Sequence, residues 1–235
     1  MVYQIFYKIM PVLCLLFSSY SFANIRISQS IIDFWPEQIA RQDISVFNEG
    51  SKRIFVEVTP YEIIKPGTEN EKRSYEPNPE KRGLLVSPAK LILEPGEMKI
   101  VRFALLGSKD KERIYRTTIK PVPYGEIKSN QKIMVKVLVG YEVLVIARPK
   151  NTDSNIQVSI KEGVAIFTNT GNTNALLLNA VQCDSNDDKC THFPAKRLYP
   201  GITHKIPLPY SASVLKYILS TGNKQQHFTL ETNSK

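Results

Sequence analysis

Residues 133–149 read IMVKVLVGYEVLVIARP and form one apolar run built mainly from Val, Ile and Leu, with Lys136, Gly140 and Glu142 inside it. An ordinary β-strand has about 5–6 residues, so this run is long enough for a strand of roughly twice that length. It does not suit a membrane span, because two charges and a glycine interrupt fewer than the ~20 apolar residues that a spanning helix needs. The run therefore predicts a long strand.

The first half of this run alternates in a way that suggests a binding function. If the segment is extended, Ile133, Val135, Val137 and Val139 point to one side, and the residues between them point to the other. A long strand with spare apolar side chains can complete the sheet of another protein. We therefore expect these four residues to form a binding strand.

The N-terminal residues have the pattern of a secretory signal. Lys8 precedes the apolar stretch 9–17, and residues 21–23 (Ser-Phe-Ala) supply a small-x-small cleavage site. Cleavage after Ala23 would leave Asn24 as the first residue of an exported chain. The apolar stretch is too short to span a bilayer, so we expect residues 1–23 to be a signal peptide and the protein not to insert in a membrane.

Charge and length narrow the classes of partner and fold. The chain has 31 Lys and Arg against 22 Asp and Glu, a formal net charge of +9. In an exported protein this favours acidic proteins or an anionic membrane surface over nucleic acid, although a role in solubility alone explains the charge equally well. The residues after the signal are enough for two domains of ~100 residues.

The cysteines predict one disulfide. Cys14 lies in the signal, which leaves Cys183 and Cys190 as an even pair in an exported chain. Closing so short a loop contributes roughly 2.5 kcal/mol on the chain-entropy model. A metal site with His192 as third ligand is the alternative, but the spacing fits no common zinc pattern. We expect no metal.

Short alternating or apolar segments recur at the spacing of an all-β sandwich. In the first half they cover residues 25–34, 42–48, 53–61, 84–87, 90–93, 99–105, 112–121 and 133–148. In the second half they cover residues 156–160, 164–168, 175–182, 196–198, 204–208, 215–220 and 227–231. Residues 65–83 are polar and Pro-rich and predict an exposed loop. Pro149 cannot donate to a sheet ladder, so the domain boundary is placed at 148–151, between domains 24–149 and 150–235.

Several short motifs together resemble one family, the PapD-like periplasmic chaperones of pilus assembly. In chain order they are LVSPAK at 85–90, LEPG at 93–96, VRF at 101–103, KERIYR at 111–116, the long run ending in Arg148-Pro149, FTNTGN at 167–172 and LYPG at 198–201. The Tyr-Arg pair at 115–116, the predicted disulfide and the Asn-Thr-Gly-Asn turn most resemble the alternate branch that assembles colonisation-factor and common-type pili. The resemblance implies two immunoglobulin-like β-sandwich domains arranged as a boomerang.

The resemblance also implies a function, partners and a location. Such chaperones act in the periplasm, donate a strand of the first domain (residues 133–144 here) to an incomplete pilin, and deliver the pilin to an outer-membrane usher. No cofactor is implied, because hand-off exchanges one strand for another. An exposed apolar strand can also promote self-association of the free form.

The family's best-known branch fixes the register with an Arg and a Lys that clamp the carboxylate at the pilin C-terminus. The matching positions here hold Ile31 and Leu144, so the clamp is absent or moved. A relocated anchor must still be a cation, preferably an Arg that grips a carboxylate with two bonds. The candidates, in order of preference, are Arg116, Arg26 and Lys120.

Two further residues match a buried ion pair between the domains of the family. They are Glu112 and Arg148, and the third member of the family's cluster, an acid in the second domain, has no clear match. We expect the pair to hold the angle between the domains.

Three other readings of the sequence remain open. A pilin or adhesin would carry a free alternating N-terminal extension, but the alternation after Ile25 is weak. An enzyme would need a catalytic motif, and His192, His204 and His227 have no Ser or Cys nucleophile motif near them. A generic exported binding module would explain the fold without a pilin partner. We expect the protein not to be an enzyme.

Overall fold

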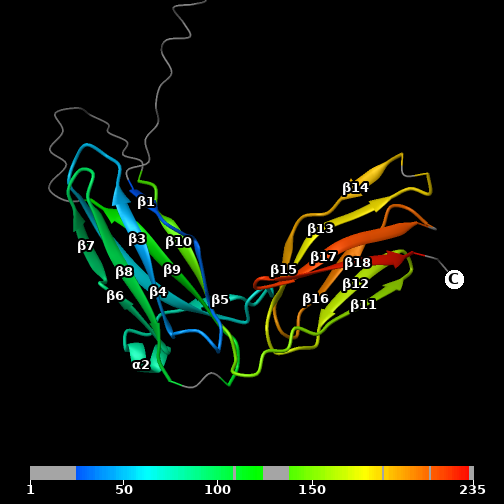
Figure 1. The fold of residues 1–235 in the computed structure, drawn as a ribbon, viewed down its shortest axis with the longest axis horizontal. Coiled ribbons are helices and arrows are strands. Elements are labelled where there is room, and N and C mark those ends of the chain that lie inside the picture. Colours follow the sequence, from blue (N-terminus) through cyan, green and yellow to red (C-terminus); the bar gives the residue numbers. More distant parts are fainter. Residues whose placement is uncertain (1–24, 108–109, 124–137, 187, 212, 233–235) are drawn as a thin grey trace, which may run out of the picture.

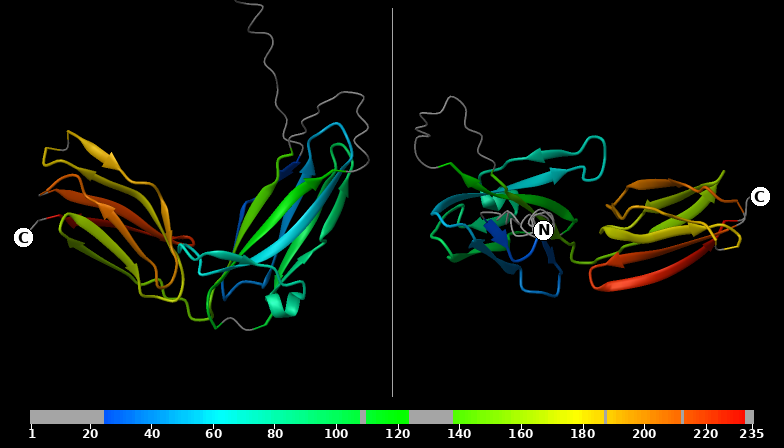
Figure 2. Two further views of the ribbon diagram at one scale, coloured as in Figure 1. Left: turned by 180° about the vertical axis from the view of Figure 1, so that it is seen from behind. Right: turned by 90° about the horizontal axis from the view of Figure 1, so that it is seen from above.

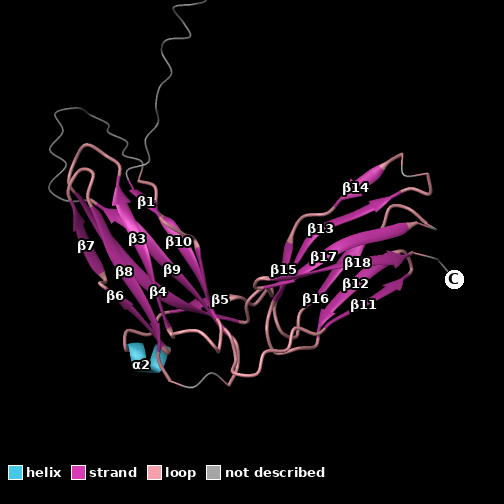
Figure 3. Cartoon of the chain, viewed as in Figure 1, coloured by secondary structure: helices cyan, strands magenta, loops and turns pink. Residues whose placement is uncertain are grey.

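The computed structural model describes residues 25–107, 110–123, 138–186, 188–211 and 213–232. These residues form two β-sandwich domains that meet at one end and diverge from there, like the arms of a V (Figure 1). Strands make up nearly all of the regular structure, and the one helix in the described part of the chain is a single turn (Figure 3). The predicted signal at 1–23 lies outside the described residues.

Domain one consists of two packed sheets. The first has the strand order β1 (Ile25–Ile27), β3 (Arg41–Asn48), β8 (Met98–Leu105) and β6 (Leu84–Ser87). The second has the order β2 (Ile31–Phe34), β10 (Tyr141–Ala147), β9 (Arg113–Val122), β4 (Ile54–Ile64) and β5 (Lys72–Ser74), and β7 (Lys90–Leu93) also pairs with β4. Below, the second is called the β10 sheet.

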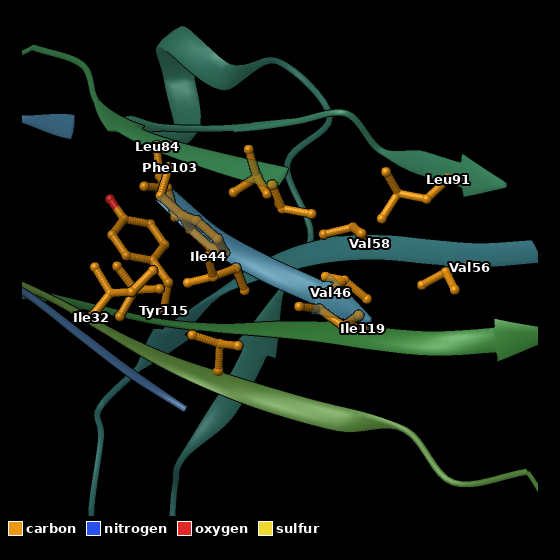
Figure 4. Packing of buried hydrophobic residues seen from close by; sticks show 14 of the residues in the cluster. Ile32, Ile44, Val46, Val56, Val58, Leu84, Leu91, Phe103, Tyr115 and Ile119 are labelled. Atoms are coloured by element: carbon orange, nitrogen blue, oxygen red, sulfur yellow. The ribbon is translucent and has the colours of Figure 1, made fainter. Parts of the chain in front are cut away.

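Alternate residues of both sheets fill the core of domain one. Ile44 and Phe103 point inward from the first sheet, and Val58, Tyr115 and Ile119 point inward from the β10 sheet (Figure 4). Each fully buried aliphatic or aromatic side chain contributes about 1.5–3 kcal/mol through the hydrophobic effect. This burial fixes which face of each strand is turned away from the core.

Domain two has the same construction on a smaller scale. One sheet contains β11 (Ile156–Lys161), β12 (Val164–Asn169) and β16 (Thr203–Pro207). The other contains β14 (Cys190–His192), β13 (Ala175–Cys183), β17 (Val214–Thr221) and β18 (Lys224–Glu231), and β15 (Lys196–Leu198) pairs with β13. The Cys183–Cys190 disulfide joins β13 to β14. The β17–β18 turn lies at the domain junction, and β18 runs from it toward the outer tip (Figure 2).

The predicted strand over residues 25–34 is wrong, because two strands in different sheets occupy it. β1 pairs with β3, whereas β2 runs parallel to β10. The buried residues change from odd-numbered to even-numbered positions where the chain changes sheet. Ile25 is buried in β1, whereas Ile32 and Phe34 are buried in β2. A strand that crosses from one sheet to the other must turn its side chains over.

The predicted loop over residues 65–83 is also more ordered than expected. β5 pairs with β4 in the register Glu62 with Ser74. The helix α2 (Pro79–Arg82) follows, with the Asn78 side chain accepting a hydrogen bond from the Glu80 backbone N–H and with Gly83 in the left-handed conformation at its C-cap. One helical turn is too short to show the period on which helix prediction depends.

The continuous strand predicted over residues 133–148 is wrong in its central part. Within the described residues 138–148, β10 is the only strand, and residues 138–140 lie outside any ladder. The pairing of β10 with β9 ends at Tyr141 opposite Ile119, and Gly140 comes next, a residue that weakens strand interiors. Residues 133–137 lie outside the described part of the chain.

Candidate functional site

The β10 sheet has a second face, which is turned toward domain two. Val143 and Val145 point into the core of domain one, so Glu142, Leu144 and Ile146 lie on the opposite face. We call this opposite face of the β10 sheet the cleft face. Residues 143–147, at the end of the long run, are all apolar because both faces of β10 are covered there.

An apolar cluster closes the cleft face against domain two. Ile63 from β4, Ile114 from β9, and Leu144 and Ile146 from β10 pack against Tyr199 of domain two. Each of these residues is buried. The contact therefore joins the two domains through the side of the sheet that the core of domain one does not use.

Arg148 is the polar centre of the domain junction, and its side chain is 1% exposed. Its Nε and Nη2 donate to Oδ1 and Oδ2 of Asp33 at 2.7 and 2.8 Å, and its Nη1 donates to Thr173 Oγ1 at 2.7 Å and to the Asn174 carbonyl at 3.3 Å. The guanidinium also lies over the Trp35 ring, 4.3 Å from its centroid. The side chain thus connects three elements of the junction.

Glu112 lies beside Arg148, with 3.9 Å between Glu112 Oε2 and Arg148 Nη1. Oε2 accepts hydrogen bonds from Thr173 Oγ1 and from the backbone N–H and side-chain amide of Asn174, all in domain two. Burial raises the pKa of Glu112, because the apolar surroundings oppose its charge more than these bonds and Arg148 favour it. The two residues predicted as an inter-domain pair are thus brought together, and Glu112 contacts domain two directly.

Asp33 is a junction residue that the sequence analysis missed. It binds Arg148 from within domain one, whereas the family's third member, for which the sequence has no clear match, is an acid in domain two. The sequence did offer one clue to this role. Asp33 lies between the buried Ile32 and Phe34, so its side chain points away from the core, on the same face as the clamp position Ile31.

Trp35 and Gly222 form a second contact between the domains. A Cβ atom on Gly222 would lie 2.2 Å from Trp35 Cζ2, so the turn between β17 and β18 touches the indole with no room for a side chain. Next to this contact a cavity of ≈ 500 Å³ is lined by Trp35, Asp33, Arg148 and Arg197, among others. Burial lowers the pKa of Arg197 there.

The structure places the predicted anchor candidates at three different locations. Leu144 pairs with Ile31 of β2 on one side and with Arg116 of β9 on the other, so Arg116 lies next to the clamp position Leu144 and one strand further from Ile31. By contrast, Arg26 is on β1 in the other sheet. Lys120 is further along β9.

The two remaining candidates have ordinary surface partners. Arg26 pairs with Glu49 and lies over the Phe47 ring. Lys120 Nζ lies 3.5 Å from Glu57 Oε2. Among the three candidates, only Arg116 is therefore next to the position that the family uses for its clamp.

Arg116 shares a carboxylate with a second arginine that sequence reasoning did not find. Arg116 Nη1 lies 3.3 Å from Glu142 Oε2, and Arg73 Nη2 lies 2.6 Å from Glu142 Oε1. Arg73 comes from β5, in the segment predicted as a loop. We call Arg73, Arg116 and Glu142 the cleft triad.

Of the four predicted donor residues, only Val139 lies in the described part of the chain, where its side chain is 48% exposed. Ile133, Val135 and Val137 fall within residues 124–137, which the structure does not describe. The ladder between β10 and β2 begins at Leu144 opposite Ile31. The described residues of β10 before Leu144 therefore have no ladder to β2.

The histidines weighed as catalytic residues lie on three different strands. His192 is on β14, His204 on β16 and His227 on β18. Within the described ranges, no three His, Cys, Asp or Glu side chains gather in a way that could hold a metal ion. None of the described helices has the length and apolar character needed to cross a bilayer.

Two β-sandwich domains that meet at a buried junction of one arginine and two acids define the class of two-domain assembly chaperones. The family model "Pili and flagellar-assembly chaperone, PapD N-terminal domain" matches residues 25–153. The chain belongs to this family.

Individual relatives agree with this assignment. A CS1 fimbrial subunit of Escherichia coli is 29% identical over 168 residues, which cover 67% of this chain and 70% of the relative. A CFA/I fimbrial subunit of the same organism is 29% identical over 167 residues, covering 67% and 69%. These relatives support the predicted resemblance to the alternate branch.

Solved structures share the fold. The crystal structure of the class 5 fimbriae chaperone CfaA has 22% identity and a TM-score of 0.66, covering 90% of this chain and 100% of that chain. The complex of the Salmonella enterica SafA pilin with the SafB chaperone has 16% identity and a TM-score of 0.62, covering 90% and 99%. The predicted fold class, two immunoglobulin-like domains, is confirmed.

Proposed function

We propose that this chaperone binds nascent pilins in the periplasm by donor-strand complementation and delivers them to an outer-membrane usher. A pilin that lacks its last strand exposes a groove and an open sheet edge, which is an aggregation hazard. A donated strand satisfies the main-chain groups of that edge, and its alternate side chains fill the groove. Strand exchange at the usher then needs no cofactor and no catalysis by the chaperone.

The observation that supports this proposal is that the odd-numbered apolar row of β10 extends beyond the core of domain one, to the exposed Val139. In an extended continuation of β10, Val139 and the odd-numbered residues before it fall in line with Val143 and Val145, which pack in that core. The core ends near Tyr141, and Val139 beyond it is exposed. In the sequence, this row of odd-numbered apolar residues continues to Ile133, which supports the proposal that a partner covers it.

The anchor for the pilin carboxylate is assigned to Arg116, with Arg73 beside it. Register matters because a slip of one residue turns every donor side chain to the wrong face. Arg116 is next to Leu144 in the sheet, and two guanidinium groups on one face suit a carboxylate. The relative named as a chaperone bound to a pilin supports the choice of partner.

Co-expression with the pilin encoded beside this chaperone, followed by a pull-down, tests the proposal. Val137→Asp puts a charge on the donor face and is expected to abolish a soluble one-to-one complex. Leu138→Asp puts the same charge on the opposite face and is expected to keep the complex. Circular dichroism establishes that both variants are folded. Equal recovery of pilin by both folded variants would exclude strand donation in this register.

A further inference from the structure

The cleft triad reaches across the β10 sheet from β10 to its edge strand β5. The sheet order is β10, β9, β4, β5, so the ion pair between Glu142 on β10 and Arg73 on β5 crosses the two strands between them. Arg116 on β9, one of those two strands, contacts the same carboxylate. One carboxylate is thus held by two guanidinium groups that belong to segments far apart in the chain.

The triad has the composition of an occupied carboxylate site. Each guanidinium has five N–H donors in a planar fork that matches a carboxylate, and the described contacts engage one nitrogen of each. Two positive charges around one negative charge leave a net positive charge. The two guanidinium groups around Glu142 are therefore of the kind that would also suit a carboxylate from another chain.

A second carboxylate cannot bind well while Glu142 stays in place. Two carboxylates that share one site repel each other, and one of them must be neutralised or displaced. Glu142 is two residues before Leu144 on the strand that pairs with Arg116, so its side chain stays within reach of the arginines. Because it belongs to the same chain, it competes at a high effective concentration.

We propose that Glu142 is a built-in competitor that occupies the pilin anchor of the free chaperone, and that the C-terminal carboxylate of a pilin displaces it from Arg116 and Arg73. This inference rests on the proposed function. Loading is then an exchange of one carboxylate for another. A chain that does not also pair with the donor strand would bind more weakly, because it must displace Glu142 without that additional contact. In the free chaperone, the Glu142 carboxylate also reduces the repulsion between the two arginines.

The test measures binding of a synthetic peptide that carries the last ~15 residues of the pilin encoded beside the chaperone, a length that covers a donor-type strand. The peptide is prepared as the free acid and as the C-terminal amide, and fluorescence anisotropy gives each Kd. Glu142→Gln removes the competing charge and is expected to tighten free-acid binding about 3- to 10-fold, because the peptide carboxylate no longer has to displace a charged side chain from two partly exposed ion pairs. The amide should bind both proteins alike.

A matched control and a second variant separate the possible outcomes. Glu57→Gln removes the same charge from an ion pair with Lys120 elsewhere on the sheet and should leave binding unchanged. Arg116→Gln should remove the preference for the free acid over the amide. If Arg116→Gln removes that preference but Glu142→Gln does not tighten binding, the competitor is refuted and the anchor stands. If neither wild type nor Glu142→Gln prefers the free acid, both the competitor and the anchor are refuted, while the pull-down still decides strand donation.

Discussion

Replacing Glu112 by Ala tests the domain junction most directly. The Glu112 side chain is 3% exposed, and its Oε2 accepts three hydrogen bonds from domain two, one from Thr173 and two from Asn174. The substitution removes this acceptor and leaves those donors buried without it. Arg148 also loses one of its two acidic neighbours.

The expected loss of stability follows from these contacts. A hydrogen bond to a charged group contributes about 1.5–3 kcal/mol, so three bonds would contribute roughly 4.5–9 kcal/mol if nothing opposed them. The carboxylate recovers its hydration on unfolding, and water can enter the space that Ala leaves. The net cost is therefore about 3–5 kcal/mol, as for one partner removed from a buried ion pair. Glu112→Gln keeps an oxygen acceptor and should cost less than half of this.

Urea unfolding followed by circular dichroism measures the loss. With a slope of about 2–3 kcal/mol/M, a loss of 3–5 kcal/mol lowers the midpoint by roughly 1–2.5 M. Small-angle X-ray scattering of the folded variant should show a wider distribution of domain angles. An unchanged midpoint in Glu112→Ala would refute the role of this residue in the junction.

The difference in stability between wild type and Glu112→Gln should change with pH in one direction. Burial raises the pKa of Glu112 in the folded chain, so the folded state binds more protons than the unfolded state between the two pKa values. Stability then falls as pH rises from about 4.3, the ordinary pKa of a glutamate, through the raised value. Wild type should lose stability relative to Glu112→Gln over this window. A difference that stays constant with pH would contradict the buried, ionisable state.

The remaining predictions concern the two ends of domain two. Replacing Cys183 and Cys190 together by Ser should lower the free energy of unfolding by about 2.5 kcal/mol, and reduction of the wild type by dithiothreitol should have the same effect; an unchanged urea midpoint would contradict it. Gly222→Ala should displace Trp35, the only tryptophan of the chain, and shift its fluorescence emission while costing about 1–3 kcal/mol. Gly163→Ala is the matched control, because Gly163 has a similar positive φ with open space around it; equal emission shifts in both would exclude the contact.

Much of the fold follows from local pattern. The alternation of apolar residues in segments such as 42–48 and 99–105 predicted strands that the structure contains as β3 and β8. Alternation is sufficient there because each strand lies between a core and solvent, and burial selects one face. The paired cysteines predicted the disulfide in the same way, since they lie opposite each other at the end of a hairpin-like loop.

The tertiary structure decided which charges meet. Arg148 was identified from its motif, but its partner Asp33 lies at the other end of domain one in the chain and becomes a neighbour only because β2 and β10 pair in parallel. Arg73 lies in a polar segment without a detectable period, and it reaches Glu142 because β5 extends the β10 sheet. Such contacts depend on strand order, which local sequence does not encode.

The sequence by itself therefore determined the family, the β-sandwich domains and the apolar row that we propose as the donor strand. These are properties of a single segment, in which the period of side chains along an extended chain is fixed at two. The tertiary structure alone decided that the cleft face carries two arginines around one glutamate. That property belongs to four strands packed side by side, and the free energy that aligns them comes mainly from a core to which none of the three charged residues contributes.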